Sequence, residues 1–127
     1  MERRIVPAES PYVATVGYSR AIRVGPHVHV AGTAPIMPGE ADPPPDPYEQ
    51  AKRCLEIVLA ALAELGAGPE HVVRTRAYLT NADDWKEVGR AHGEVFADVR
   101  PASAMVVVSS LLDPRWRVEL EVDALVA

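Results

Sequence analysis

The 127-residue chain has one cysteine, no long apolar run and no apolar leader segment, and each shortage excludes a class of protein. Because Cys54 is the only cysteine, no disulfide can form within the chain. No stretch approaches the roughly 18 consecutive apolar residues of a membrane-spanning helix. Residues 1–4 are followed by no apolar signal segment, so we expect a cytoplasmic protein.

Basic residues are also too few for a nucleic-acid-binding protein. The chain has 13 Lys and Arg against 18 Asp and Glu, which gives a formal net charge of −5 at pH 7. Affinity for nucleic acid comes mostly from clustered Lys and Arg that bind phosphate. We therefore expect neither a nucleic acid nor a membrane as the partner.

Signatures of cofactor and metal sites are missing from the sequence. It contains no glycine-rich phosphate loop, no nucleophile elbow and no dinucleotide fingerprint. His27 and His29 fall on one face of an expected strand, but the spacing identifies no third ligand for a metal. The lone Cys54 is typical of a small core residue rather than a reactive thiol. We expect no cofactor and no bound metal.

The C-terminal end carries two different strand patterns. From Val118 to Val126 apolar residues alternate with mostly charged ones, which predicts a strand with one buried face. Met105 to Val108 are four consecutive apolar residues, which predicts burial of both faces. Residues 1–127 form one domain with few helices to cover a second sheet face. We expect another copy of the chain to cover it.

Two helices interrupt the strands. Asp46 is a good N-cap with Pro47 at the first helical position, and the apolar stripe that follows ends at Gly66. Asn81 can cap a second helix, whose apolar stripe includes His92 as a packed, hydrogen-bonded histidine. This order predicts an α+β fold, a mixed five- or six-stranded sheet with both helices on one face. Strands are expected at residues 12–14, 21–24, 27–32, 72–79, 102–109 and 117–125.

The sheet face opposite the helices is expected to mix charged and large apolar side chains. Such a face suits a subunit interface with a cleft at its rim. Either Glu119 or Glu121 can pair with an arginine of the neighbouring strand, and we expect this of Glu121. The face carries Arg74, Arg76, Tyr78, Glu119 and Glu121.

Four short motifs stand out in the sequence: residues 10–13 (SPYV), 30–35 (VAGTAP), 101–106 (PASAMV) and 118–121 (VELE). In order and spacing they resemble the RidA/YjgF family, the reactive-intermediate deaminases. The first two are similar to that family's N-terminal half, and the last two to its Pro-Ala-Arg-Ser strand and its Ile-Glu-Ile-Glu strand. The resemblance covers nearly the whole chain. It implies a chorismate-mutase-like fold and a homotrimer whose active sites lie between subunits.

The resemblance also implies roles for individual residues. Glu119 would position the water that attacks an imine carbon, because a carboxylate can hold a water and accept its proton. Tyr12 would cover the substrate, and Gly32 with Thr33 would lie close against it. Ser103 stands where the family has the arginine that grips a substrate carboxylate. Losing that contact, worth on the order of 1.5–3 kcal/mol, argues against a standard 2-imino acid as substrate.

A second departure from the family is Ala31, where a serine usually contacts the ligand. Arg76 is the best substitute for the missing cation, and Arg100 and Arg117 are weaker candidates.

Three functions are compatible with the sequence. The first is a hydrolase acting on an enamine or imine, and the second is a non-catalytic trimer that binds a small metabolite. The weakest alternative is an endoribonuclease, an older label for some relatives, because the acidic balance does not suit RNA.

Overall fold

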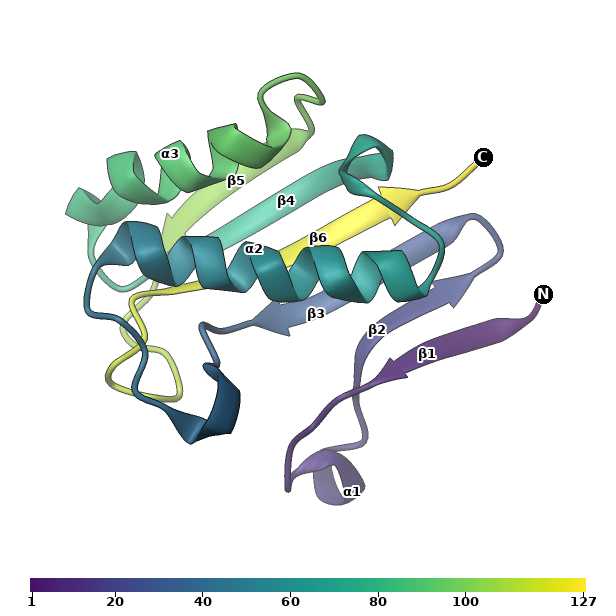
Figure 1. Cartoon of the computed structure of the whole chain (residues 1–127), viewed down its shortest axis with the longest axis horizontal. Helices are drawn as coiled ribbons and strands as arrows, with labels where there is room; N and C mark the ends of the chain where they lie inside the picture. The colour runs from purple at the N-terminus through teal and green to yellow at the C-terminus, as the bar shows by residue number, and fades with distance from the viewer.

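The chain folds around one mixed six-stranded sheet (Figure 1). The computed structural model describes all residues from Met1 to Ala127. The spatial order is β1-β2-β3-β6-β4-β5. Neighbouring strands are antiparallel except β4 and β5, which are parallel. The predicted α+β fold is therefore confirmed. The strands are β1 Arg3–Pro7, β2 Ser19–Val24, β3 His27–Thr33, β4 Val72–Leu79, β5 Ala102–Val107 and β6 Val118–Leu125.

Two long helices, α2 (Pro47–Glu64) and α3 (Trp85–Phe96), lie across one face of the sheet, as predicted (Figure 1). The Asp46 side chain accepts a hydrogen bond from the Tyr48 backbone N–H at 3.3 Å, so α2 begins where the sequence predicts. Asn81 caps the short 3-10 turn Ala82–Asp84 that leads into α3. The other short elements are α1 (Val13–Val16) and the 3-10 turns Pro38–Glu40 and Pro69–His71.

The N-terminal strand prediction was wrong. Residues 13 and 14 belong to the single helical turn α1, and Tyr12 is its N-cap. Gly17 closes this turn in a left-handed conformation (φ 76°), and its N–H donates to the Val13 carbonyl at 2.8 Å. The strand that the sequence missed is β1, which pairs with β2 at the edge of the sheet. It was hard to predict because only Val6 of its five residues is buried.

The core lies between the sheet and the two long helices. Every second residue of β6 from Val118 to Ala124 is apolar, at most 3 % exposed and packed in the core shared with the apolar stripe of α2. The alternating positions of β6 consequently face away from the helices. This row is Glu119, Glu121 and Asp123.

Two strand irregularities, one in β3 and one in β4, change the face of the sheet to which nearby side chains point. Between β3 and β6, Val30 pairs with Val122 and Thr33 with Leu120, so β3 has one extra residue and forms a bulge. In β4 a similar irregularity puts Val72 in the core and leaves Val73 49 % exposed. Alternation along residues 72–79 groups Val73 with Thr75, Ala77 and Leu79, and the irregularity removes it from that buried face.

Strand β5 is an edge strand, and its apolar residues are exposed in the single chain. Val106 is 46 % and Val107 56 % exposed, although the four-residue apolar run predicted burial on both faces. An edge strand of this kind offers unpaired backbone groups and apolar side chains to a neighbour. The expected burial is therefore absent within one chain.

Candidate active site

The face of β6 that points away from the helices carries three carboxylates in a row. Its neighbour β4 places Tyr78 opposite Glu119 and Arg76 opposite Glu121, and Asp123 follows on the same face. The register follows from the alternation in both strands, since a shift by one residue would turn the carboxylates into the core. The expected composition of this face is confirmed.

Two of the three carboxylates already have partners. Glu121 Oε1 accepts hydrogen bonds from the Tyr78 hydroxyl at 2.6 Å and from Arg76 Nη1 at 3.1 Å. An Asp123 oxygen lies 2.7 Å from His29 Nδ1, and its other oxygen lies 3.5 Å from Arg76 Nη1. Glu119 has neither a side-chain hydrogen bond nor an ion pair within the chain. The expectation that Glu121 pairs with an arginine is confirmed.

Glu119 is half-buried at the edge of an open hollow of about 350 Å³. Burial raises the pKa of its carboxyl, the nearby Arg20 guanidinium opposes that rise, and Glu121 adds to it. A carboxylate with free oxygens and a raised pKa can hold a water molecule and accept its proton. The hollow is lined by Tyr78, Val108, Ser110, Leu111, Leu112, Glu119 and Glu121.

Gly32 lies directly against the Glu119 side chain. A methyl carbon placed on Gly32 would stand 3.1 Å from Glu119 Oε2 and 3.3 Å from its carboxyl carbon. The β3 bulge and the missing side chain thus make room for the carboxylate. Thr33, the next residue, turns into the core with 0 % exposure and donates its hydroxyl to the Ala31 carbonyl at 2.7 Å.

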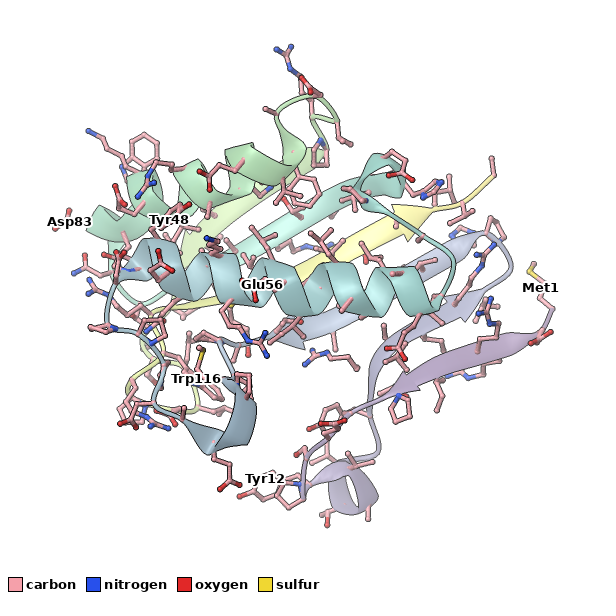
Figure 2. The ribbon with its side chains drawn as sticks, in the orientation of Figure 1. Met1, Tyr12, Tyr48, Glu56, Asp83 and Trp116 are labelled. Carbon is pink, nitrogen blue, oxygen red and sulfur yellow. The ribbon has the colours of Figure 1, made fainter.

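Two predicted site residues lie elsewhere in the single chain. Tyr12 is 67 % exposed and sits beside α1, away from β6 (Figure 2). Ser103 faces α3, where its Oγ accepts a hydrogen bond from Thr75 Oγ1 at 2.8 Å. The structure brings Gly32 and Glu119 together, and it does not bring Tyr12 or Ser103 to them.

His92 is a packed, hydrogen-bonded histidine, as predicted. Its Nε2 lies 2.8 Å from Thr75 Oγ1, and its ring packs on Phe96 with centroids 4.7 Å apart. Burial lowers the pKa of His92, which keeps the imidazole neutral near pH 7. His92 therefore joins α3 to the sheet rather than to the Glu119 hollow.

The candidate arginines are mostly committed to other groups. Arg76 faces the Glu119 side of the sheet, but Glu121 and Asp123 hold its Nη1. Arg117 makes a two-pronged salt bridge to the buried Asp84, at 2.9 and 2.7 Å, so it belongs to the helix side. The Arg100 side chain donates only to a backbone carbonyl three residues earlier.

Arg20 is the residue that sequence reasoning missed. Its Nη2 donates to the carbonyl oxygens of Ala31 at 3.0 Å and Gly32 at 2.6 Å. The sequence predicts a strand that begins at Ala21, whereas β2 begins at Ser19. Arg20 is the extra residue at an irregularity in the pairing of β2 with β1, so strict alternation along the strand does not identify it.

Gln50 fixes the loop that forms one wall of the hollow. Its Nε2 donates to the carbonyls of Pro44 at 2.8 Å and Arg115 at 2.9 Å, and its Oε1 accepts the Arg117 N–H at 2.7 Å. Gln50 is 0 % exposed. Gln50→Leu leaves these backbone groups without partners, so we expect a loss of about 1–3 kcal/mol in the free energy of unfolding. Urea denaturation of both proteins measures it, and an unchanged midpoint would contradict this role.

The structure offers no cluster of metal ligands. No group of three or more His, Cys, Asp or Glu side chains lies close enough to hold a metal ion. His27 and His29 stack with ring centroids 6.4 Å apart. Cys54 is buried against the Val118 carbonyl, and burial raises the pKa of its thiol, which confirms it as a core residue. None of the helices is long and apolar enough to cross a membrane.

Comparisons with known proteins agree with this geometry. Residues 8–126 match the family described as Endoribonuclease L-PSP. An uncharacterized Streptomyces coelicolor protein is 40 % identical over 95 % of this chain and 90 % of its own length. A RutC family protein of Pyrococcus abyssi is 38 % identical over 74 % of this chain and 75 % of its own.

A solved structure extends the agreement to the fold. The crystal structure of Rv2704 from Mycobacterium tuberculosis, described as a member of the YjgF/YER057c/UK114 family, is 42 % identical to this chain. It has a TM-score of 0.88, with 98 % of this chain and 100 % of that chain covered. With the sequence motifs, the sheet order and these matches in agreement, the chain belongs to the RidA/YjgF family.

Proposed function

We propose that the chain is a small-molecule hydrolase that releases ammonia from an enamine or imine. The observation that supports it is Glu119, which has no partner in the chain and lies in the hollow while Glu121 and Asp123 are held by ion pairs. A half-buried carboxylate without a partner destabilises the folded chain, and such groups are typical of functional sites rather than of purely structural positions. Its position matches the glutamate to which the family resemblance assigns the water.

In the proposed reaction Glu119 holds a water molecule and accepts one of its protons as the oxygen attacks the imine carbon. The C=N bond becomes a C–N single bond as Glu119 passes that proton to the nitrogen, which gives a carbinolamine. Glu119 then accepts the proton of the new hydroxyl group and delivers it to the nitrogen as the carbonyl forms, the C–N bond breaks and ammonia leaves. Atoms balance as imine plus water giving carbonyl compound plus ammonia, and the carboxylate is regenerated.

We further propose that three copies assemble around the open face of the sheet. The exposed Val106 and Val107 of β5 and the charged row of β6 are surfaces that a single chain leaves uncovered. Such assembly also supports the expected roles of Tyr12 and Ser103, because residues distant within one chain can meet across an interface. The site is then shared between neighbouring copies.

The substrate class can be tested by ammonia release. Because Ser103 replaces the family's arginine, we expect 2-aminoacrylate generated in situ to react roughly ten- to a hundredfold more slowly than with a relative that keeps Pro-Ala-Arg. An imine without a carboxylate should show no such deficit between the two proteins. Equal rates on 2-aminoacrylate would contradict this interpretation of Ser103.

A non-catalytic metabolite-binding trimer is the second candidate. It is favoured by Arg76, whose charge is already taken by Glu121 and Asp123 and is not free to grip an anionic substrate. A binder would take up an imine analogue without releasing ammonia, and isothermal calorimetry beside the ammonia assay separates the two. An endoribonuclease remains the weakest alternative, since the carboxylates of the open face repel phosphate.

A further inference from the structure

Arg20 reaches from β2 across the neighbouring strand β3. Its Nη2 donates to both carbonyl oxygens of the β3 bulge, those of Ala31 at 3.0 Å and Gly32 at 2.6 Å. A bulge leaves backbone groups outside the regular ladder, and here one guanidinium binds them. Arg20 therefore holds the segment of β3 that touches Glu119.

Glu119 contacts the same bulge. Its carboxylate lies against Gly32, the residue whose carbonyl accepts a hydrogen bond from Arg20 Nη2. Arg20 makes hydrogen bonds only to carbonyl oxygens and has no carboxylate within ion-pair distance. Its positive charge is consequently available to Glu119, which has no other partner.

The remaining charged and titratable groups around Glu119 are engaged elsewhere. From β4, Arg76 binds Glu121 and Asp123, and Tyr78 donates to Glu121. Glu121, on the same strand as Glu119, adds negative charge. From α2, the buried Cys54 thiol has a raised pKa and stays neutral. Burial raises the pKa of the Glu119 carboxyl, and the positive charge of Arg20 opposes part of that rise.

Resting on the function proposed above, we propose that Arg20 is the positioning residue of this site. It fixes the β3 bulge against which the Glu119 carboxylate lies, and it supplies the positive charge that faces that carboxylate. In this role Arg20 acts through Glu119: its Nη2 is occupied by two carbonyls and its Nε is buried, which leaves only Nη1 without a hydrogen bond.

Part of the environment of Arg20 is unfavourable for the stability of the fold. Its Nε is buried without a hydrogen-bond partner, and burial lowers the pKa of the guanidinium. A buried donor without a partner destabilises the folded chain. Arg20→Met keeps the length of the side chain and removes this unpaired donor, but it also leaves the Ala31 and Gly32 carbonyls without their hydrogen bonds, so the melting temperature should fall only modestly.

The direct test is a ¹³C NMR titration of the Glu119 carboxyl, assigned with Glu119→Gln. In Arg20→Met the titration midpoint should move to higher pH, while Arg20→Lys should stay near the original because the charge is kept. Arg23→Met is the matched control, since Arg23 lies on β2 and also binds two carbonyls, those of Gly25 and Leu65. That variant should leave the midpoint unchanged.

Two results would overturn the proposal. One is an Arg20→Met midpoint equal to that of the original protein. The other is an equal shift in Arg20→Lys and Arg20→Met, which assigns Arg20 a structural role only. In an ammonia assay, Arg20→Met should also move the acid limb of the pH–rate profile upward and lower the rate about tenfold. If the original protein releases no ammonia, the proposed function fails while the titration still decides the role of Arg20.

Discussion

Glu119→Gln should reduce ammonia release by about a hundredfold or more, because glutamine cannot accept the proton of the attacking water. Glutamine has nearly the same shape, so binding of an unreactive imine analogue should change little. The measurement is the turnover rate of both proteins on the same in-situ imine, with analogue affinity measured beside it. Loss of analogue binding in parallel with turnover would contradict a role in the chemical step.

The matched control for that variant is Asp123→Asn. Asp123 lies on the same face of β6 but is paired with His29 and Arg76, so this change should leave turnover within a few-fold of the original. Equal losses in the two variants would mean that Glu119 acts only through the general charge of the face.

The same substitution has an expected effect on stability. The folded-state pKa of Glu119 is raised, mainly by burial, so the folded chain holds this proton more tightly than the unfolded chain does. The ionised carboxylate therefore destabilises the fold at pH values above its unfolded pKa, and this effect disappears as pH falls below that value. Glu119→Gln should raise the melting temperature at pH 7, with a smaller advantage at acidic pH.

Gly32→Val should reduce turnover by roughly ten- to a hundredfold while the chain stays folded. The added side chain meets the Glu119 carboxylate, where even a methyl carbon stands 3.1 Å from Oε2, and it pushes the carboxylate out of line with the substrate. A displacement of about 1 Å in a catalytic group is worth up to a hundredfold in rate. The measurement is turnover, with circular dichroism to confirm the fold.

Gly93→Ala is the control for adding a side chain at a glycine. Gly93 lies in α3, and a methyl carbon there has no other atom within 4 Å. Turnover should be unchanged, and the free energy of unfolding should rise by about 0.5–1 kcal/mol because alanine is the better helix former. Full turnover in Gly32→Val would show that Gly32 need not be a glycine for Glu119 to work.

Much of the fold could be predicted from local patterns. The alternation in β6 identified which side chains face the helices, and Asp46 with Pro47 located the start of α2. These features depend on residues close in sequence, so spacing alone reports them. The pairing of Glu121 with an arginine of the neighbouring strand was predictable from the alternation within each strand, which places the charged side chains of both strands on one face.

The rest depends on contacts between distant residues. The β3 bulge arises from pairing with β6, and it decides that Gly32 touches Glu119 while Thr33 turns into the core. Arg20 contacts β3 because β2 and β3 lie side by side in the folded sheet, so local spacing does not reveal the contact. Ser103 faces α3 because parallel pairing with β4 sets it beside Thr75, which no pattern in residues 102–107 reveals.

The central claim is that the open face of the sheet is covered by other copies of the chain, which complete the hollow around Glu119. Its most direct test is the mass in solution at working concentration, measured by light scattering. We predict a species of three times the 13.7 kDa chain mass. A stable single-copy species that still releases ammonia at the full rate would contradict the claim.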